Sequence, residues 1–321
     1  MLLKLFRPTM RSAALVFSFI QFAGCTSFNY TQADSPIALA MVPPMNPRPQ
    51  VALVLGSGGP RGFAHIGVMK VLEEAGIEYD LVVGSSVGSL IGAFWASGYT
   101  APEIDGLSRQ GGPLTVFDFS IFADRGWIHG QRLQDFVNDR LRSPRLETMP
   151  RKFIAVATRL NDKQPVFFQS GNAGVAVRAS SAVSKIISPV GILGVEYEDG
   201  DESLPVAVRA ARQAGAKFVI AVDVTAIPGT APAGTSVSRL HREARRRARI
   251  DPELIHADFV IRPDLGFKTS PTPEFFDHAR RSGEHAANRI LPSLKAALAI
   301  AEAHPKNFST DTNSHTSGGS R

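Results

Sequence analysis

The chain has 321 residues, enough for one large α/β domain or two modest ones, and its 44% hydrophobic content predicts a sizeable buried core. A single cysteine excludes a framework of intrachain disulfides, and the sequence has no His, Cys and carboxylate cluster at ligand spacing, so we expect neither a metal nor an organic cofactor. The formal net charge of +6 favours anionic partners.

The first residues have the pattern of a secretory signal. Three basic residues precede an apolar run over 13–20, which is too short for a comfortable transmembrane span. The run leads to Phe22-Ala23-Gly24-Cys25, which resembles the lipobox of bacterial lipoproteins, whose cysteine is lipidated. We therefore expect a signal peptide over 1–24 and membrane anchoring through Cys25. Because Thr26 and not an acid follows, the outer membrane or periplasm is favoured over the inner membrane; an ordinary signal with an incidental cysteine is the alternative.

Composition divides the remaining chain. Residues 25–49 are rich in Pro, Asn and Ser and predict an extended tether. Residues 304–321 are polar and rich in Ser, Thr and Gly, which predicts a disordered tail. We expect residues 50–303 to form a single domain.

Within that domain, apolar runs of strand length alternate with segments of helical periodicity. The predicted strands cover residues 51–55, 80–83, 152–158 and 217–223. The predicted helices cover 63–75, 90–97 and 275–303, the last with a break at Pro292. This alternation predicts an α/β fold with a mostly parallel central sheet and helices on both faces, and ligand sites at the carboxyl ends of the strands.

The first strand runs into a glycine turn, Gly56-Ser57-Gly58-Gly59-Pro60-Arg61-Gly62. The turn lacks the acid that a dinucleotide fingerprint needs at the end of the next strand, and it lacks the Gly-Lys-Ser/Thr of a P-loop. What remains is a set of backbone N–H groups at a helix N-terminus. Two fixed N–H donors are what an acyl-transfer enzyme needs at its oxyanion, whereas a turn that only allows tight strand–helix packing is the alternative.

The second strand ends in Gly84-Ser85-Ser86-Val87-Gly88, a Gly-x-Ser-x-Gly turn of the kind that presents a nucleophilic serine. Because the two turns end neighbouring strands and lead into helices, we expect them to lie side by side. A conventional hydrolase would add a carboxylate and a histidine in that chain order. Asp223 followed by His241 or His256 fits the order, although none of these histidines lies in a recognisable loop signature.

A dense basic block occupies residues 241–249. Such a block can form a solvated helix face without a partner, or it can bind an anionic membrane or nucleic acid. Export from the cytoplasm argues against nucleic acid, which we do not expect as a partner.

Three segments together resemble a patatin-like phospholipase domain. Residues 53–98 resemble its start, with Gly-Ser-Gly-x-x-Arg-Gly as the oxyanion turn. Residues 176–201 are similar to its second catalytic block, and 257–266 to a later strand. The resemblance covers roughly residues 50–300 and implies a three-layer fold without a cofactor.

The resemblance also implies a serine acyl hydrolase of the phospholipase A or lysophospholipase type, which cleaves lipid esters with a Ser–Asp dyad and no histidine. By position, Ser86 is the nucleophile and Asp199 the base. The amides of Gly58 and Gly59 form the oxyanion hole, with Arg61 beside it. The remaining motif positions shape the turns: Ser57, Gly62, Gly84, Gly88 and Gly200. An aspartate has an ordinary pKa near 4, so the base needs a dry environment that raises its pKa.

Two positions depart from the family pattern. Asp201 stands where the family usually has Gly or Ala, and it adds a like charge near the base. Lys185 stands in place of the usual proline–glycine turn. The alternatives to the dyad enzyme are therefore a Ser-Asp-His esterase and a catalytically silent lipoprotein that binds lipid.

Overall fold

The computed structural model describes residues 29–110, 116–120, 123, 125–142, 144–227 and 229–303. The predicted signal peptide, Cys25 and the predicted tail lie outside these residues. No helix within the described ranges is long and apolar enough to cross a bilayer.

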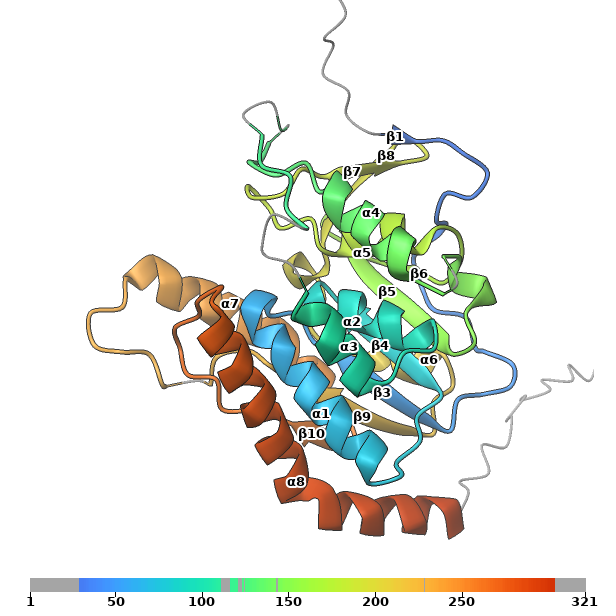
Figure 1. Cartoon of the computed structure of the whole chain (residues 1–321), viewed down its shortest axis with the longest axis vertical. Coiled ribbons are helices and arrows are strands. Elements are labelled where there is room, and N and C mark those ends of the chain that lie inside the picture. The colour runs from blue at the N-terminus through green and yellow to red at the C-terminus, as the bar shows by residue number, and fades with distance from the viewer. Residues whose placement is uncertain are drawn as a thin grey trace, which may run out of the picture.

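The described chain contains a ten-stranded sheet whose centre is parallel (Figure 1). From one edge to the other the main path runs β1-β7-β8-β5-β4-β3-β9-β10. The parallel run at its centre consists of β5 (Lys152–Arg159), β4 (Leu81–Ser85), β3 (Val51–Leu55), β9 (Phe218–Val222) and β10 (Phe259–Ile261). Strands β4 and β9 are buried along their whole length, as expected for parallel strands covered on both faces.

Helices cover both faces of the sheet, which confirms the predicted three layers. Their bounds are α1 (Phe63–Glu74), α2 (Val87–Ala96), α3 (Ala101–Ser108), α4 (Gln131–Arg140), α5 (Ala173–Ser180), α6 (Val208–Gln213), α7 (Val237–Leu254) and α8 (Pro273–Ala303). Short 3₁₀ turns lie at η1 (Gly59–Gly62), η3 (Leu146–Thr148) and η4 (Gly200–Glu202).

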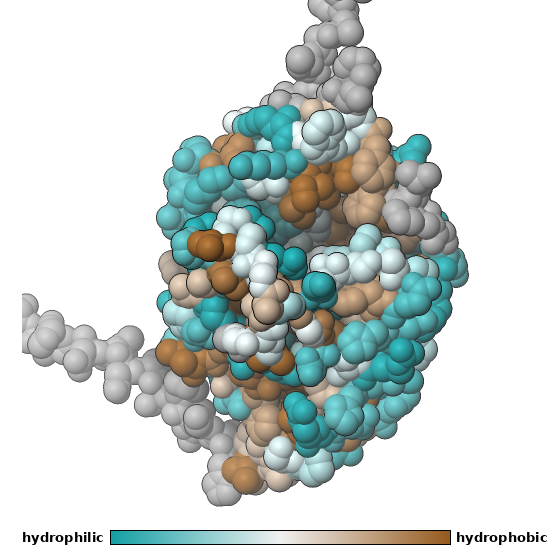
Figure 2. All heavy atoms as spheres, turned by 90° about the vertical axis from the view of Figure 1, so that its left-hand side faces the viewer, coloured by the Kyte–Doolittle hydropathy of each residue, from teal (hydrophilic) through white to brown (hydrophobic). Residues whose placement is uncertain are grey.

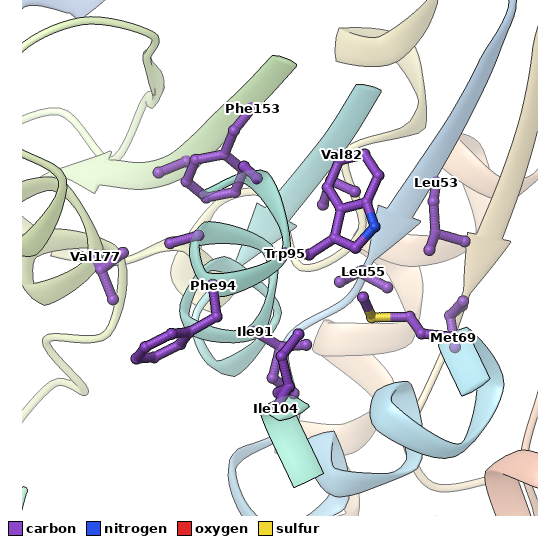
Figure 3. Close-up of a cluster of buried hydrophobic side chains, with 14 of the residues drawn as sticks. Leu53, Leu55, Met69, Val82, Ile91, Phe94, Trp95, Ile104, Phe153 and Val177 are labelled. Atoms are coloured by element: carbon purple, nitrogen blue, oxygen red, sulfur yellow. The ribbon is translucent and has the colours of Figure 1, made fainter. Parts of the chain in front are cut away.

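Successive residues of each central strand contribute to two different cores, because side chains alternate between the faces of a sheet. Leu53 and Leu55 of β3 pack with Met69 of α1 and Trp95 of α2 in the larger core (Figure 3). Ala52 and Val54 face the other way, into the smaller core under α6 and α7.

One side of the sheet is antiparallel, which the sequence pattern did not predict. Strand β6 (Pro165–Phe168) pairs with β5, and the hairpin of β7 (Val190–Ile192) and β8 (Val195–Asp199) is joined to β5 through β8. This hairpin brings the end of β8 beside the end of β5, where Asp199 lies opposite Ala157.

The prediction of an extended tether over 25–49 is wrong for its described part, residues 29–49. Strand β1 (Asn29–Tyr30) pairs with β7, and β2 (Ala38–Leu39) pairs with β6. Val42 is only 3% exposed, and the Met45 amide donates to the carbonyl of Ala214. The prolines prevent long strands but leave enough N–H groups to hydrogen-bond to the domain.

The predicted elements are otherwise confirmed, with small shifts at their ends. The second helix begins at Val87 and not at 90, directly after Ser86. The predicted break at Pro292 is a bend, because α8 continues through the proline and turns sharply in Figure 1.

Candidate active site

Ser86 occupies a strained turn between β4 and α2. Its φ of 54° and ψ of −125° are unusual for a residue with a side chain. A Cβ atom at Gly84 would overlap the carbonyl of Gly88, and a Cβ at Gly88 would overlap the carbonyl of Leu55. The two glycines therefore allow the turn to close tightly against β3, and this packing holds Ser86 in its strained conformation.

The hydroxyl of Ser86 donates a hydrogen bond to the carboxylate of Asp199, with Oγ 2.6 Å from Oδ2. The sheet register explains how residues far apart in the chain meet. Strand β5 pairs on one side with β4, with Val156 opposite Ser85, and on the other side with β8, with Ala157 opposite Asp199. The serine turn and the carboxylate therefore lie on either side of the same stretch of β5.

Backbone and side-chain hydrogen bonds fix Asp199 in place. Its amide donates to the carbonyl of Ala182, and its own carbonyl accepts from the Thr158 hydroxyl at 2.8 Å. Its Oδ1 accepts from the Asp201 amide at 2.8 Å, which leaves Oδ2 for Ser86. Because each carboxylate oxygen accepts a hydrogen bond, the side chain of Asp199 is oriented before any substrate arrives.

The pKa of Asp199 is raised to about 7. Burial is the largest cause, since the residue is only 2% exposed, and the negative charge of Asp201 adds to it. The hydrogen bonds from Ser86 and from the Asp201 amide, and the charge of Arg246, act in the opposite direction. A carboxylate with a pKa near neutrality is suited to accept and return a proton at physiological pH.

The negative charge of Asp201, next to Asp199, is balanced by a neighbouring cation. Its Oδ1 accepts from Nε of Arg246 at 2.7 Å and from the hydroxyl of Ser57. Nη2 of Arg246 also donates to Oγ of Ser57, at 3.1 Å. The family departure at position 201 is therefore matched by an arginine from α7, which also binds the serine of the first glycine turn.

Arg246 belongs to the basic block, which divides between two environments. Arg246 and Arg247 are turned inward, with side chains 15% and 14% exposed. His241, Arg242 and Arg245 are exposed. The sequence analysis did not identify Arg246 as part of the site. Helical spacing was the available signal, because Arg246 lies one turn before Ile250, which is fully buried.

The first glycine turn packs against the start of α2. A Cβ at Gly62 would overlap the side chain of Val87, so the turn can approach the serine helix only with glycine there. Gly59 has a φ of 53°, in the left-handed region. Within the described chain the amides of Gly58 and Gly59 donate no hydrogen bond, so both remain available as donors.

Gly200 and Arg61 complete the predicted set. A Cβ at Gly200 would overlap the Ser85 hydroxyl and lie 2.5 Å from the Val156 carbonyl, so glycine is required beside the serine turn. Arg61 is 5% exposed and donates through Nη2 to the carbonyl of Phe267 at 2.7 Å, and burial lowers its pKa. Arg61 thus binds a neighbouring loop, where it supports the first glycine turn.

The alternative triad is not assembled. The Asp223 carboxylate accepts from Arg247 at 2.6 Å, from Arg262 at 3.1 Å and from Thr225 at 2.6 Å. His241 and His256 are exposed, and neither is hydrogen-bonded to Ser86 or Asp223 in the described structure. Asp223 instead joins α7 to the ends of β9 and β10. Among the described residues, no three His, Cys, Asp or Glu side chains are grouped to hold a metal ion.

Comparison with known proteins identifies the family of the domain that contains this site. Residues 53–208 match the family model described as patatin-like phospholipase. The chain carries a patatin-like phospholipase domain. This domain contains both glycine turns, Ser86 and Asp199, and over residues 53–208 the resemblance inferred from the sequence is confirmed.

The patatin-like domain has relatives in bacteria and fungi. The chain is 35% identical over 182 residues to an uncharacterized NTE family protein of Mycobacterium tuberculosis, a match that covers 55% of this chain and 49% of that protein. It is 32% identical over 189 residues to lysophospholipase NTE1 of Coccidioides immitis, covering 57% of this chain and 12% of that protein. The chain therefore spans about half the length of the mycobacterial relative and a small part of the fungal one.

Among solved structures, VipD from Legionella pneumophila is similar, with a TM-score of 0.50 and 14% sequence identity. The match covers 82% of this chain and 71% of VipD. At this identity the similarity supports the fold alone, and it agrees with the mostly parallel sheet between two layers of helices.

Proposed function

We propose that this protein is a serine acyl hydrolase that cleaves ester bonds of phospholipids or lysophospholipids. The observation that carries the proposal is the 2.6 Å hydrogen bond from Ser86 to an Asp199 carboxylate whose pKa is raised to about 7. The lipid substrate class is supported by the patatin-like domain and by the fungal relatives named lysophospholipases.

In the proposed reaction, Oγ of Ser86 attacks the ester carbonyl carbon while its proton passes to Oδ2 of Asp199. The amides of Gly58 and Gly59 stabilise the negative oxygen of the tetrahedral intermediate. The carbon–oxygen bond to the alcohol breaks, and the departing alcohol takes the proton from Asp199. Water then loses a proton to Asp199 as it attacks the acyl-enzyme, and the proton returns to Ser86 as the fatty acid leaves.

Hydrolysis of a water-soluble short-chain ester and of a lysophospholipid tests this proposal. Ser86→Ala is expected to lower kcat/KM by on the order of 10³-fold or more. Asp199→Asn should cause a loss of similar size, because asparagine cannot accept the proton. His241→Ala together with His256→Ala is the matched control and should retain parental activity. Loss of activity in that control would favour the Ser-Asp-His esterase, and unchanged turnover in Ser86→Ala would favour a silent lipid-binding protein.

We also propose that the protein is a lipoprotein anchored through Cys25, at the outer membrane or facing the periplasm. The support is the signal-like start followed by Phe22-Ala23-Gly24-Cys25. Incorporation of labelled palmitate by the parent, and its loss in Cys25→Ser, is the expected result, with outer-membrane fractionation of the parent. Palmitate incorporation that persists in Cys25→Ser would contradict the anchor.

A further inference from the structure

Two chain segments meet beside the active site through a small parallel pairing. Ile128 forms a parallel bridge with Ile187. The amides of Trp127 and Ile128 both donate to the carbonyl of Ile186, at 2.8 and 3.0 Å. The Ser188 amide donates back to the carbonyl of Ile128 at 2.9 Å. The two segments are therefore held in a fixed register.

This register sorts four large apolar side chains into two faces. Ile128 and Ile187 are 4% and 5% exposed and point into the domain. Their neighbours Trp127 and Ile186 lie at a bend and a turn directly before the bridge, and the bond from the Trp127 amide to the Ile186 carbonyl places them next to each other on the outside. They are 67% and 49% exposed. An outward face of this kind normally carries polar side chains, so adjacent exposed Trp and Ile indicate a contact surface.

The apolar surface extends toward the site. Val183 is 37% exposed and opens the turn that contains Ile186. It directly follows Ala182, whose carbonyl accepts from the Asp199 amide at 3.0 Å. Phe119, which is 61% exposed, extends the surface on the far side through its bridge to Ile128. We call these four exposed residues, Phe119, Trp127, Val183 and Ile186, the Trp127 patch.

Helix α7 and the loop containing Trp127 lie on the side of the molecule that is at the left in Figure 1. Figure 2 views that side directly and shows hydrophobic side chains above a hollow near its centre. Helix α7 carries the exposed Arg242 and Arg245. The apolar surface and a helix with exposed cations therefore lie on one side of the molecule.

Lys185 adds a cation at the tip of the turn, between Val183 and Ile186. It is exposed and has a φ of 66°, a left-handed conformation in which glycine would be unstrained. A lysine held in a strained conformation beside exposed apolar groups points to a use of its charge.

We propose that the Trp127 patch and Lys185 dock the domain onto a phospholipid surface that carries anionic headgroups. The inference rests on the proposed lipid hydrolase function and names the surface from which the substrate enters. Tryptophan and lysine suit a bilayer interface, because each combines an apolar body with a group that stays hydrated. The cation of Lys185 complements anionic headgroups, and the adjacent apolar side chains can enter the acyl boundary.

Co-sedimentation with vesicles tests the docking apart from catalysis. The protein is the full chain with Cys25→Ser, so that no acyl anchor contributes, and with Ser86→Ala, so that the vesicles stay intact. Vesicles of phosphatidylcholine alone are compared with vesicles of phosphatidylcholine and phosphatidylglycerol in equal parts. Trp127→Gln combined with Ile186→Gln should weaken binding to both by on the order of tenfold or more. Lys185→Gly, which keeps the left-handed backbone, should weaken binding a few-fold to the anionic vesicles only.

Ile300→Gln is the matched control, because Ile300 is 65% exposed on α8, away from the patch. It should bind vesicles like the parent. The proposal would be overturned if Ile300→Gln weakened vesicle binding as much as the patch variants do, or if the parent did not bind vesicles. It would also be overturned if gel filtration showed that the patch instead pairs two copies of the chain. When the patch substitutions are made in a protein that keeps Ser86, all of these variants should hydrolyse a water-soluble short-chain ester at the parental rate. If the parent failed to hydrolyse that ester but still bound vesicles through the patch, the hydrolase function would fail and the docking would stand.

Discussion

Replacing Arg246 by glutamine changes the charge balance around the base without touching Ser86 or Asp199. Arg246 contacts Asp201 at 2.7 Å, and the Asp201 amide in turn donates to Oδ1 of Asp199. Arg246→Gln removes the cation and leaves the Asp201 carboxylate with the Ser57 hydroxyl as its remaining side-chain partner. The uncompensated negative charge makes ionisation of Asp199 harder, so the pKa of Asp199 should rise.

The size of the effect follows from the starting pKa of about 7 for Asp199. Loss of one neighbouring cation should raise this pKa by roughly one unit. At pH 6 the ionised fraction of the base then falls from about a tenth to about a hundredth, so kcat/KM should fall about tenfold. At pH 9 both proteins have an ionised base, and their kcat/KM values should nearly coincide.

The assay is the pH profile of kcat/KM for a soluble ester. Asp201→Asn removes the like charge and should move the profile to lower pH, the opposite direction. The double variant should give a profile between those of the two single variants, because the charges of Asp201 and Arg246 act on Asp199 in opposite directions. Arg245→Gln is the matched control, since Arg245 is exposed on the same helix, and its profile should equal that of the parent. A uniform loss of activity at every pH in Arg246→Gln, or a shift to lower pH, would refute this electrostatic reasoning.

Two further predictions concern stability, both measured by thermal unfolding. The folded pKa of Asp199 is about 7, above its ordinary value of 3.8, so the stability of the parent falls as the pH rises from 3.8 to about 7. The free energy of unfolding of Asp199→Asn should therefore exceed that of the parent by roughly 2–4 kcal/mol at pH 8 and by less at pH 5. A larger stabilisation at pH 5 than at pH 8 would contradict the raised pKa of Asp199. Gly62→Ala should destabilise the domain by about 1–3 kcal/mol, because the new methyl overlaps Val87. Gly106→Ala, in α3 with open space around it, should instead stabilise by roughly 0.5–1 kcal/mol, and similar losses in both would contradict the packing argument.

The parallel half of the fold could be predicted from the sequence because its signals are local. The strand at 51–55 is a continuous apolar run, and glycines mark the turns at both ends of the following helix. The antiparallel half has weaker signals. Strand β7 has three residues and β8 carries two glutamates, so neither has a pattern that distinguishes it from a loop.

Residues 29–49 show the limit of composition as a guide. A segment rich in proline has no periodicity, and its structure here comes from partners that are distant in the chain, such as Ala214 for Met45. The same limit applies to α7. Its basic composition suggested a surface, but Arg246 and Arg247 find carboxylates supplied by other elements.

The parts of the site that depend on neighbouring residues in the sequence could be predicted, and those that depend on residues far apart in the chain could not be predicted from the residues alone. Ser86 follows from the glycines around it, since a strand-to-helix turn with this spacing exposes its central residue. Asp199 lies 113 residues further along the chain, and only the family resemblance, not the residues alone, pairs it with Ser86. Arg246 was missed because nothing in the sequence says which carboxylate a helix arginine will meet.

Labelling with an active-site-directed fluorophosphonate tests most directly the claim that Ser86 and Asp199 act together. The parent should acquire a single covalent adduct that maps to Ser86. Ser86→Ala and Asp199→Asn should both resist labelling while their circular dichroism and thermal unfolding show a folded protein. Labelling of Asp199→Asn at the parental rate, or an adduct on another residue, would contradict the account.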